Sequence, residues 1–176
     1  MNLPNRVTLV RIFLIPLFVA VVTLRIPYGD YIAAAIFILA ASTDGLDGYI
    51  ARKRKMITNL GKLMDPLADK LLVTAALIVL VELQRLPSWV ALIIIGREYA
   101  VTGLRALAAV DGNVIAAGWL GKVKTVTQIV AIVALFIKDL PLILGYTAVA
   151  VAVFFTMWSG WDYFYRSWSV IKKDGI

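Results

Sequence analysis

The sequence predicts an all-α, polytopic membrane protein with six transmembrane helices and a short N-terminal interfacial segment. Of the 176 residues, 61% are hydrophobic and 16% are charged, whereas soluble domains are typically about 45–50% apolar and about 25% charged. The mean hydropathy is +0.87, and a soluble core of this size could not bury that much apolar surface. The apolar residues also fall into six stretches, each near the ~20 residues that span a bilayer.

Short breaks containing Pro, Gly or charged residues separate the six stretches, as is usual between helices. No repeat, low-complexity segment or long linker divides the chain, so we expect residues 1–176 to form a single domain. The predicted spans are residues 7–24, 31–50, 64–83, 88–109, 115–137 and 141–164.

The first stretch is expected to be a retained helix. Arg11 interrupts it and no small-x-small cleavage site follows, which argues against a cleaved signal peptide. The residues from Asn2 to Arg6 are then expected to lead into this helix along the membrane interface.

The distribution of basic residues predicts the orientation. The chain has 18 Lys and Arg against 11 Asp and Glu, a formal net charge of +7. If both termini are cytoplasmic, the outer loops carry only Arg25, Arg85 and Lys138, as the positive-inside rule requires. The sequence therefore predicts a multi-pass protein of the cell membrane. Its charge suits anionic lipid or phosphorylated substrates better than nucleic acid, because the basic residues lie between apolar spans.

The absence of Cys and His from the chain restricts the chemistry. It excludes disulfides, thiolate nucleophiles, Ser-His-Asp and Cys-His mechanisms, and zinc sites built on Cys or His. An enzyme of this composition must use carboxylates, Lys, Arg, Tyr or hydroxyl groups, with help from a metal ion that prefers oxygen ligands.

Four aspartates lie at helical spacings where the second stretch ends and the third begins. Asp44 and Asp47 are three residues apart, and Asp65 and Asp69 are four apart, so each pair shares one helix face. A charged residue near the centre of a span costs about 2.5–3.5 kcal/mol on insertion scales and is a functional candidate by default. Both pairs belong to the cytoplasmic side, so we expect the four carboxylates to meet.

Four carboxylates that meet need compensating positive charge. Two divalent cations balance them, and oxygen ligands favour Mg²⁺, Mn²⁺ or Ca²⁺, which in pairs form a clamp for phosphoryl chemistry. Gly48, Ala51 and Gly61 leave room for a substrate on the same faces, and Arg52 offers a planar fork to a phosphate. The structural alternatives are helix packing for the small residues and an Asp–Lys or Asp–Arg pair for a single aspartate.

These residues resemble the signature of the CDP-alcohol phosphotransferase family, which reads D-x-x-D-G-x-x-A-R, eight residues, then G-x-x-x-D-x-x-x-D. Every fixed position is filled here. The resemblance implies a homodimeric enzyme that cleaves a CDP-linked lipid, releases CMP and transfers the phosphatidyl group to an alcohol. It implies two divalent cations (Mg²⁺ or Mn²⁺) on Asp44, Asp47, Asp65 and Asp69, with Asp69 also the general base, and a CDP-diacylglycerol pocket lined by Gly48, Ala51, Arg52 and Gly61.

The remainder of the chain is similar to the branch of this family that uses sn-glycerol 3-phosphate and forms phosphatidylglycerophosphate. The similarity covers Asn2–Arg11, Gly96–Glu98, Gly103–Arg105, Gly121–Thr125 and Gln128. A phosphorylated acceptor needs a cationic pocket. The candidates for glycerol-phosphate binding are Arg105, Lys122, Lys124 and Arg11, and those for further contacts with CDP-diacylglycerol are Asn5 and Thr8.

Several alternatives remain open at this point. Arg97 fits an internal ion pair with Glu98 as well as it fits a ligand role, and Lys122 and Lys124 fit simple snorkelling at a helix end. The acceptor could instead be serine, an inositol phosphate or phosphatidylglycerol. An ion or proton transporter with an intramembrane aspartate cluster is the alternative outside the family, although transporter sites favour the bilayer midplane at a repeat interface.

Overall fold

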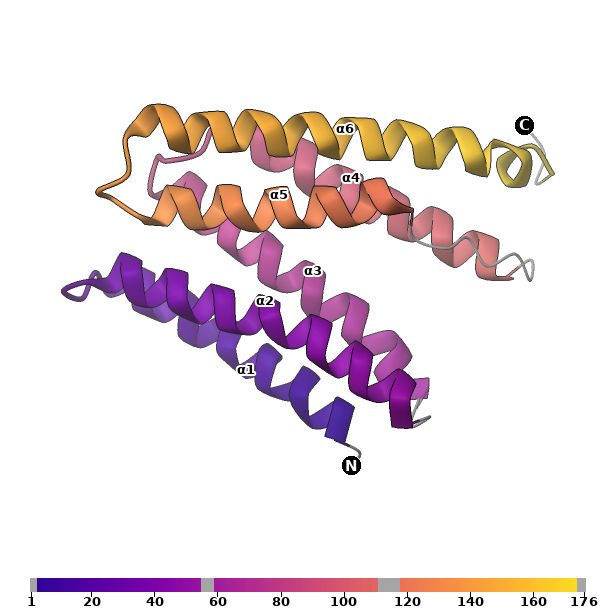
Figure 1. Ribbon diagram of the computed structural model, residues 1–176, viewed down its shortest axis with the longest axis horizontal. Helices are drawn as coiled ribbons and strands as arrows, with labels where there is room; N and C mark the ends of the chain where they lie inside the picture. The colour runs from indigo at the N-terminus through magenta and orange to yellow at the C-terminus, as the bar shows by residue number, and fades with distance from the viewer. Residues whose placement is uncertain (1–2, 55–58, 111–117, 174–176) are drawn as a thin grey trace. The chain divides into compact units, whose positions relative to one another are not determined.

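The computed structural model describes residues 3–54, 59–110 and 118–173, and the side chains of residues 8–43, 64, 66–109 and 118–168. The regular structure in these ranges is entirely α-helical, which confirms the all-α prediction (Figure 1). The helices are α1 (Leu3–Thr23), α2 (Gly29–Arg54), α3 (Asn59–Glu82), α4 (Ser88–Val110), α5 (Trp119–Phe136) and α6 (Leu142–Lys173).

Each predicted span coincides with one helix, and several helices extend beyond the apolar stretch, although α5 does not. α2 continues to Arg54 although the apolar run ends at Ile50, because Ala, Arg and Lys are good helix formers. α1 begins at Leu3, so the expected lead-in forms its first turn, where Pro4 is tolerated. The predicted break at Asp111–Asn113 and the predicted start of the fifth span at residue 115 lie outside the described residues.

Two helices are apolar enough over a sufficient length to cross a membrane, as judged over the described ranges. They are α5, over Trp119–Phe136, and α6, over Leu142–Trp168. Shorter apolar stretches occur at Thr8–Thr23 in α1 and Gly29–Thr43 in α2. The six-span arrangement stays a prediction.

The chain divides into two compact units, which are described separately. The first consists of Met1–Leu86 and Ile132–Pro141, and the second of Pro87–Ala131 and Leu142–Ile176. The prediction of a single domain over residues 1–176 stays a prediction.

In the first unit, α1, α2 and α3 pack against one another. Phe18, Phe37 and Phe136 have no exposed surface, and the Phe18 ring lies 5.5 Å from Phe136, edge to face, and 6.1 Å from Phe37. Edge-to-face aromatic pairs add about 0.5–1.5 kcal/mol beyond the burial of their area. This aromatic core fixes α1 against α2 and the end of α5.

The turn after α3 is a Schellman-type helix end. The N–H of Arg85 donates to the carbonyl of Leu80 at 2.9 Å, and the N–H of Gln84 donates to that of Val81 at 2.9 Å. Gln84 occupies the left-handed position with φ of 57°, which Gly usually fills because a Cβ costs about 1–2 kcal/mol there. The turn directs Arg85 toward the start of α2.

A cluster of charged residues, here called the loop cluster, joins that turn to the start of α2 and the segment after α5. Asp30 accepts from Arg85 at 2.8 Å and from Lys138 at 2.8 Å. Arg85 also donates to the carbonyl of Leu135 at 3.2 Å, and the Tyr31 hydroxyl donates to Asp139. Burial alone raises the pKa of Asp30, but the hydrogen bonds from Arg85 and Lys138 outweigh it, so the pKa lies below its usual value.

In the second unit, α4 packs against α6. The buried stripe of α6 follows a spacing of three and four residues and consists largely of small side chains, including Ala152, Thr156, Ser159 and Gly160. Small residues let helix backbones approach closely, as is typical of packing between membrane helices.

Candidate active site

The four predicted metal-binding aspartates lie on two helices that contact each other. Asp44 and Asp47 are in α2, and Asp65 and Asp69 are in α3. α2 is continuous from Gly29 through both of its aspartates to Arg54, so the predicted sharing of one helix face by Asp44 and Asp47 rests on regular helical backbone. The loop between the two helices, residues 55–58, lies outside the described residues.

Asp69 is the only one of the four whose side chain is described. It is half-buried and adjoins the packed face of α3, where Ala68 and Leu72 are each 1% exposed. The described side chains contain no group of three or more acidic residues able to hold a metal. This does not test the four-carboxylate prediction, because the side chains of Asp44, Asp47 and Asp65 lie outside the description.

The side chains predicted to line the CDP pocket also lie outside the description. The signature positions on α2 and at the start of α3 are helical, but their side chains are not described, and the same holds for Asn5 in the first turn of α1. These residues are Gly48, Ala51, Arg52 and Gly61. Their roles stay predictions.

Arg11 and Thr8 lie buried on α1, 0% and 1% exposed. The Nε of Arg11 donates to the carbonyl of Ala40 and to the hydroxyl of Thr43, each at 3.2 Å. Arg11 therefore links α1 to α2 at the residue directly before Asp44. Its predicted contact with the acceptor phosphate stays a prediction, but the structure shows that it orients the helix carrying the first two aspartates.

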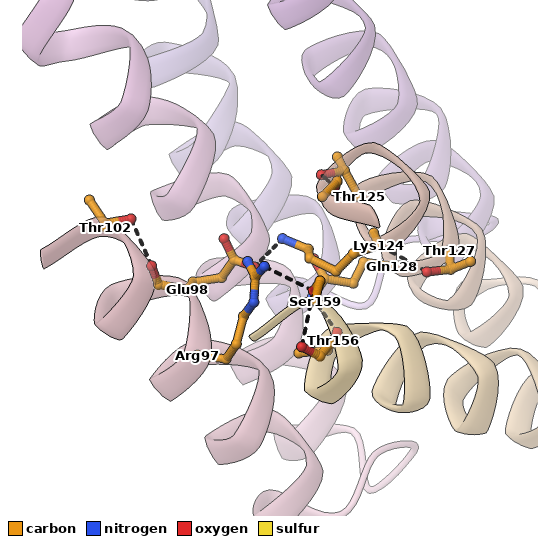
Figure 2. A network of polar contacts seen from close by, with 10 residues as sticks. Arg97, Glu98, Thr102, Lys124, Thr125, Thr127, Gln128, Thr156 and Ser159 are labelled. Atoms are coloured by element: carbon orange, nitrogen blue, oxygen red, sulfur yellow. Dashed lines mark hydrogen bonds and ion pairs between the residues drawn. The ribbon is translucent and has the colours of Figure 1, made fainter. Parts of the chain in front are cut away.

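In the second unit, polar side chains from α4, α5 and α6 form the interhelical network drawn in Figure 2. Glu98 contacts both Lys124 and Arg97, the latter at 3.4 Å. Arg97 also donates to the Ser159 hydroxyl at 2.9 Å. Gln128 donates to the Thr156 hydroxyl at 3.0 Å. The ion pair between Arg97 and Glu98, one of the two alternatives for Arg97, is thus present, and Glu98 also contacts a second cation.

Lys122 and Lys124, both predicted acceptor ligands, have different surroundings. Lys124 is buried and directed toward Glu98 on α4, whereas Lys122 is exposed. The reason is helical geometry, since residues two apart on an α-helix differ by about 200° around its axis. A pocket that uses both ammonium groups is therefore not formed by α5 alone.

Arg105 lies near the end of α4 and contacts Tyr163 of α6. Its Nε donates to the Tyr163 hydroxyl at 3.2 Å, and its guanidinium lies 5.5 Å from the centre of the ring. Arg105 is nevertheless exposed. Its hydrogen bond orients the side chain and leaves the other guanidinium donors available to a phosphate.

Sequence reasoning missed three residues that accept hydrogen bonds from Arg97, Arg105 and Gln128. Tyr163, Ser159 and Thr156 all lie on the buried stripe of α6. The available signal was their spacing of three and four residues within an apolar stretch, where hydroxyl groups need partners. Their partners lie on α4 and α5, and which helices meet cannot be read from local sequence.

Comparison with known proteins identifies the family. A model of the CDP-alcohol phosphatidyltransferases matches residues 1–158. The chain is 49% identical over 190 residues to a CDP-diacylglycerol–glycerol-3-phosphate 3-phosphatidyltransferase of Bacillus subtilis (strain 168), with 98% of each chain covered. It is 37% identical over 186 residues to the protein of that name from Pseudomonas fluorescens, which covers 99% of this chain and 94% of the relative. With the complete signature on α2 and α3, these matches show that the chain belongs to the CDP-alcohol phosphatidyltransferase family.

Proposed function

We propose that this protein transfers the phosphatidyl group of CDP-diacylglycerol to sn-glycerol 3-phosphate, giving phosphatidylglycerophosphate and CMP for phospholipid biosynthesis. The observation that carries the proposal is the complete signature, with Asp44 and Asp47 on the continuous helix α2 and Asp65 and Asp69 on α3. The choice of acceptor is supported by the near-full-length similarity to relatives that carry this enzyme's name.

The donor set fits a pair of hard divalent cations. Four carboxylates on two contacting helices offer oxygen ligands, and the chain has neither Cys nor His to favour a softer metal. Asp44, Asp47, Asp65 and Asp69 would hold two Mg²⁺ or Mn²⁺ ions. When bound, the ions would neutralise charge on the diphosphate of the lipid substrate.

The residues of the chain have distinct roles in the proposed transfer. Asp69 accepts the hydroxyl proton of glycerol 3-phosphate as that oxygen attacks the β-phosphorus of CDP-diacylglycerol. A new phosphorus–oxygen bond forms, the bond to CMP breaks, and CMP leaves with the electron pair. Arg52 pairs with a phosphate, and Gly48, Ala51 and Gly61 leave space for the nucleotide. Asn5 and Thr8 extend that lining from α1.

The acceptor pocket is proposed to be cationic. Arg105 and Lys122 are exposed and supply charge directly. Lys124 shares Glu98 with Arg97, and Arg11 reaches α2 beside Asp44. A neutral acceptor such as serine would have less use for these cations, so replacing Arg105 and Lys122 by Ala discriminates between acceptors. The KM for glycerol 3-phosphate should rise at least tenfold with little change in the KM for CDP-diacylglycerol.

We further propose a homodimer that spans the bilayer six times, with its termini and active site cytoplasmic. The apolar helices α5 and α6 support the membrane location, and the basic residues support the orientation. Because the chain has no Cys, single introduced cysteines report the topology cleanly. In intact cells, an impermeant maleimide should label Arg25→Cys and Ser88→Cys but not Lys172→Cys. Labelling of Lys172→Cys would refute the orientation.

Release of CMP is the decisive measurement. Purified protein receives CDP-diacylglycerol and Mg²⁺, with and without glycerol 3-phosphate, and chelator in a parallel sample. Release that requires both metal and glycerol 3-phosphate supports the reaction and the acceptor together. Metal-dependent release with serine or an inositol phosphate in its place would refute the acceptor. No release from folded protein with any acceptor would favour the transporter alternative.

Asp69→Asn tests the proposed base. The amide keeps the shape of the side chain but cannot accept the proton, so turnover should fall by about 10²–10⁴-fold, the usual contribution of general base catalysis. Asp139→Asn, in the loop cluster, is the matched control and should retain near-normal turnover. If Asp69→Asn retained it as well, the assignment of the base would be wrong.

A further inference from the structure

The proposed reaction assigns no role to a groove on the second unit. The groove lies between α4 and α6 and has a volume of about 960 Å³. Its lining on α6 recurs at spacings of three and four residues from Met157 to Trp168, so it follows one helix face. Two glycines widen it, Gly96 on α4 and Gly160 on α6. A Cβ built at Gly96 would meet nothing within 4 Å, so the space beside it is open.

The chemistry of the groove calls for an apolar ligand with a negative charge. Trp161, Phe164 and Trp168 form apolar walls. Arg97 and Arg166 supply two cations, each of which also contacts a carboxylate outside the lining, Glu98 and Asp162 respectively. Of the described residues that line it, none is acidic. Trp161 and Trp168 remain 77% and 57% exposed, which leaves large apolar surfaces to be covered.

The cations and the glycines are arranged along the groove. Arg97 passes directly over Gly160, where an added Cβ would lie 3.2 Å from the Arg97 Cγ. Arg166 lies six residues further along α6, about 9 Å away at 1.5 Å per residue, and Trp168 lies beyond it. Exposed Arg and Trp side chains are typical of the headgroup level of a membrane. The end near Gly96 and Gly160 then corresponds to the level of the acyl chains.

We propose that this groove binds an anionic phospholipid of the bilayer, with its phosphate at Arg166 and one acyl chain along Gly160 and Gly96. A second copy of the chain fits less well. A two-fold dimer interface is self-complementary, so it would set one cationic groove against another, and like charges repel strongly where water is scarce. An anionic lipid satisfies both the apolar walls and the charge.

Two variants and two matched controls test the site on full-length protein in detergent. Gly96→Phe adds a bulky side chain to the groove at a position where a Cβ meets nothing within 4 Å, and Gly103→Phe places the same side chain two turns further along α4, where a Cβ also meets nothing within 4 Å. Arg166→Gln removes the cation. Asp162→Asn breaks the same 2.9 Å ion pair but leaves the cation in place. Circular dichroism and gel filtration confirm that each variant is folded.

The readout is native mass spectrometry with dioleoylphosphatidylglycerol or dioleoylphosphatidylcholine as the probe. Wild-type protein, Gly103→Phe and Asp162→Asn should bind the anionic lipid at least fivefold more tightly than the zwitterionic one. Gly96→Phe and Arg166→Gln should lose that preference. Equal binding of both lipids by wild-type protein, or unchanged binding by Gly96→Phe, would overturn the proposal.

Two further measurements distinguish the other occupants. If Gly96→Phe raises the KM for CDP-diacylglycerol, the groove belongs to the substrate and the separate lipid site is refuted. If it converts a dimer to a monomer without altering lipid binding, the groove is an interface between copies and the proposal is equally refuted. An unchanged KM and oligomeric state together with weakened lipid binding support the proposal. Because binding is measured directly, it does not depend on the proposed reaction.

Discussion

The loop cluster and the interhelical network use similar ion pairs for different purposes. In the loop cluster, Asp30 meets Arg85 and Lys138 where helices end; Asp30 is 12% exposed, like the acid of the network, but its two cations are 23% and 65% exposed. In the network, Glu98 meets Arg97 and Lys124, whose side chains are 12% and 6% exposed, within the lengths of α4 and α5. Exposed pairs contribute about 0–1 kcal/mol, whereas charges inside apolar helices are costly. The first cluster therefore joins loop segments at helix ends, and the second holds two cations between helices despite that cost.

The largest expected effect comes from breaking the network at Glu98. Glu98→Gln leaves Arg97 and Lys124 buried with less compensation, and removal of one partner from a buried pair typically costs about 3–5 kcal/mol. Asp30→Asn makes the matched change in the loop cluster and should cost less than half as much. Unfolding in mixed detergent micelles measures both. Equal losses of unfolding free energy in the two variants would show that the two clusters contribute equally to stability.

The next effect concerns Gly160, which makes room for Arg97. A Cβ at this position would lie 3.2 Å from the Arg97 Cγ, so Gly160→Ala must displace that side chain and should cost about 1–2 kcal/mol, as overpacking commonly does. Gly96→Ala is the control, because its Cβ meets open space. The same unfolding assay should show it neutral or slightly stabilised. If Gly160→Ala were equally harmless, Arg97 would not depend on that close approach.

A smaller effect is expected from Arg85 in the loop cluster. Arg85→Gln removes the 2.8 Å pair with Asp30 and the donor to the Leu135 carbonyl. Because the side chain is partly exposed, the loss should be about 1 kcal/mol or less, and salt should reduce it further. Unfolding at low and high ionic strength measures both quantities. A loss that salt does not change would mean that packing, rather than charge, holds this turn.

The smallest effect is the pH dependence of the loop cluster. The pKa of Asp30 is lower in the folded protein than its ordinary value of 3.8. Its contribution to stability is therefore complete above that value and disappears as the pH falls through the lower, folded value. Stability measured from pH 7 to pH 3 should show a smaller acid loss in Asp30→Asn than in wild-type protein. Identical profiles would show that Asp30 does not contribute through its charge.

Much of the fold and of the catalytic assignment follows from local sequence. Apolar stretches of suitable length predict all six helices, and the aspartates share helix faces because of a spacing that needs no tertiary information. The predicted helix ends were less accurate than the predicted helices, because the length of an apolar stretch indicates how much of a helix lies in the hydrocarbon layer and not where the helix stops. The helix itself continues as long as residues such as Ala51 and Arg52 favour it.

The surroundings of the cationic residues were harder to predict from sequence than the helices. The spacing of Lys122 and Lys124 places them on different sides of a helix, but which of the two is buried depends on the position of Glu98 on α4. Likewise, Arg105 gains Tyr163 from a helix 58 residues away in the chain. Such partners depend on which helices pair, and that choice is made by the shapes of whole helix surfaces.

The continuity of α2 also fixes the distance between the loop cluster and the signature aspartates. Asp30 anchors one end in the loop cluster, and Asp44 follows 14 residues later on the same rigid rod, about 21 Å along its axis. The loop contacts therefore set both the depth and the rotation at which the signature meets its partner helix. One residue inserted between these two points would turn every later position by about 100° and advance it by about 1.5 Å. Such an insertion would separate the signature from the loop cluster while leaving all four aspartates in the chain.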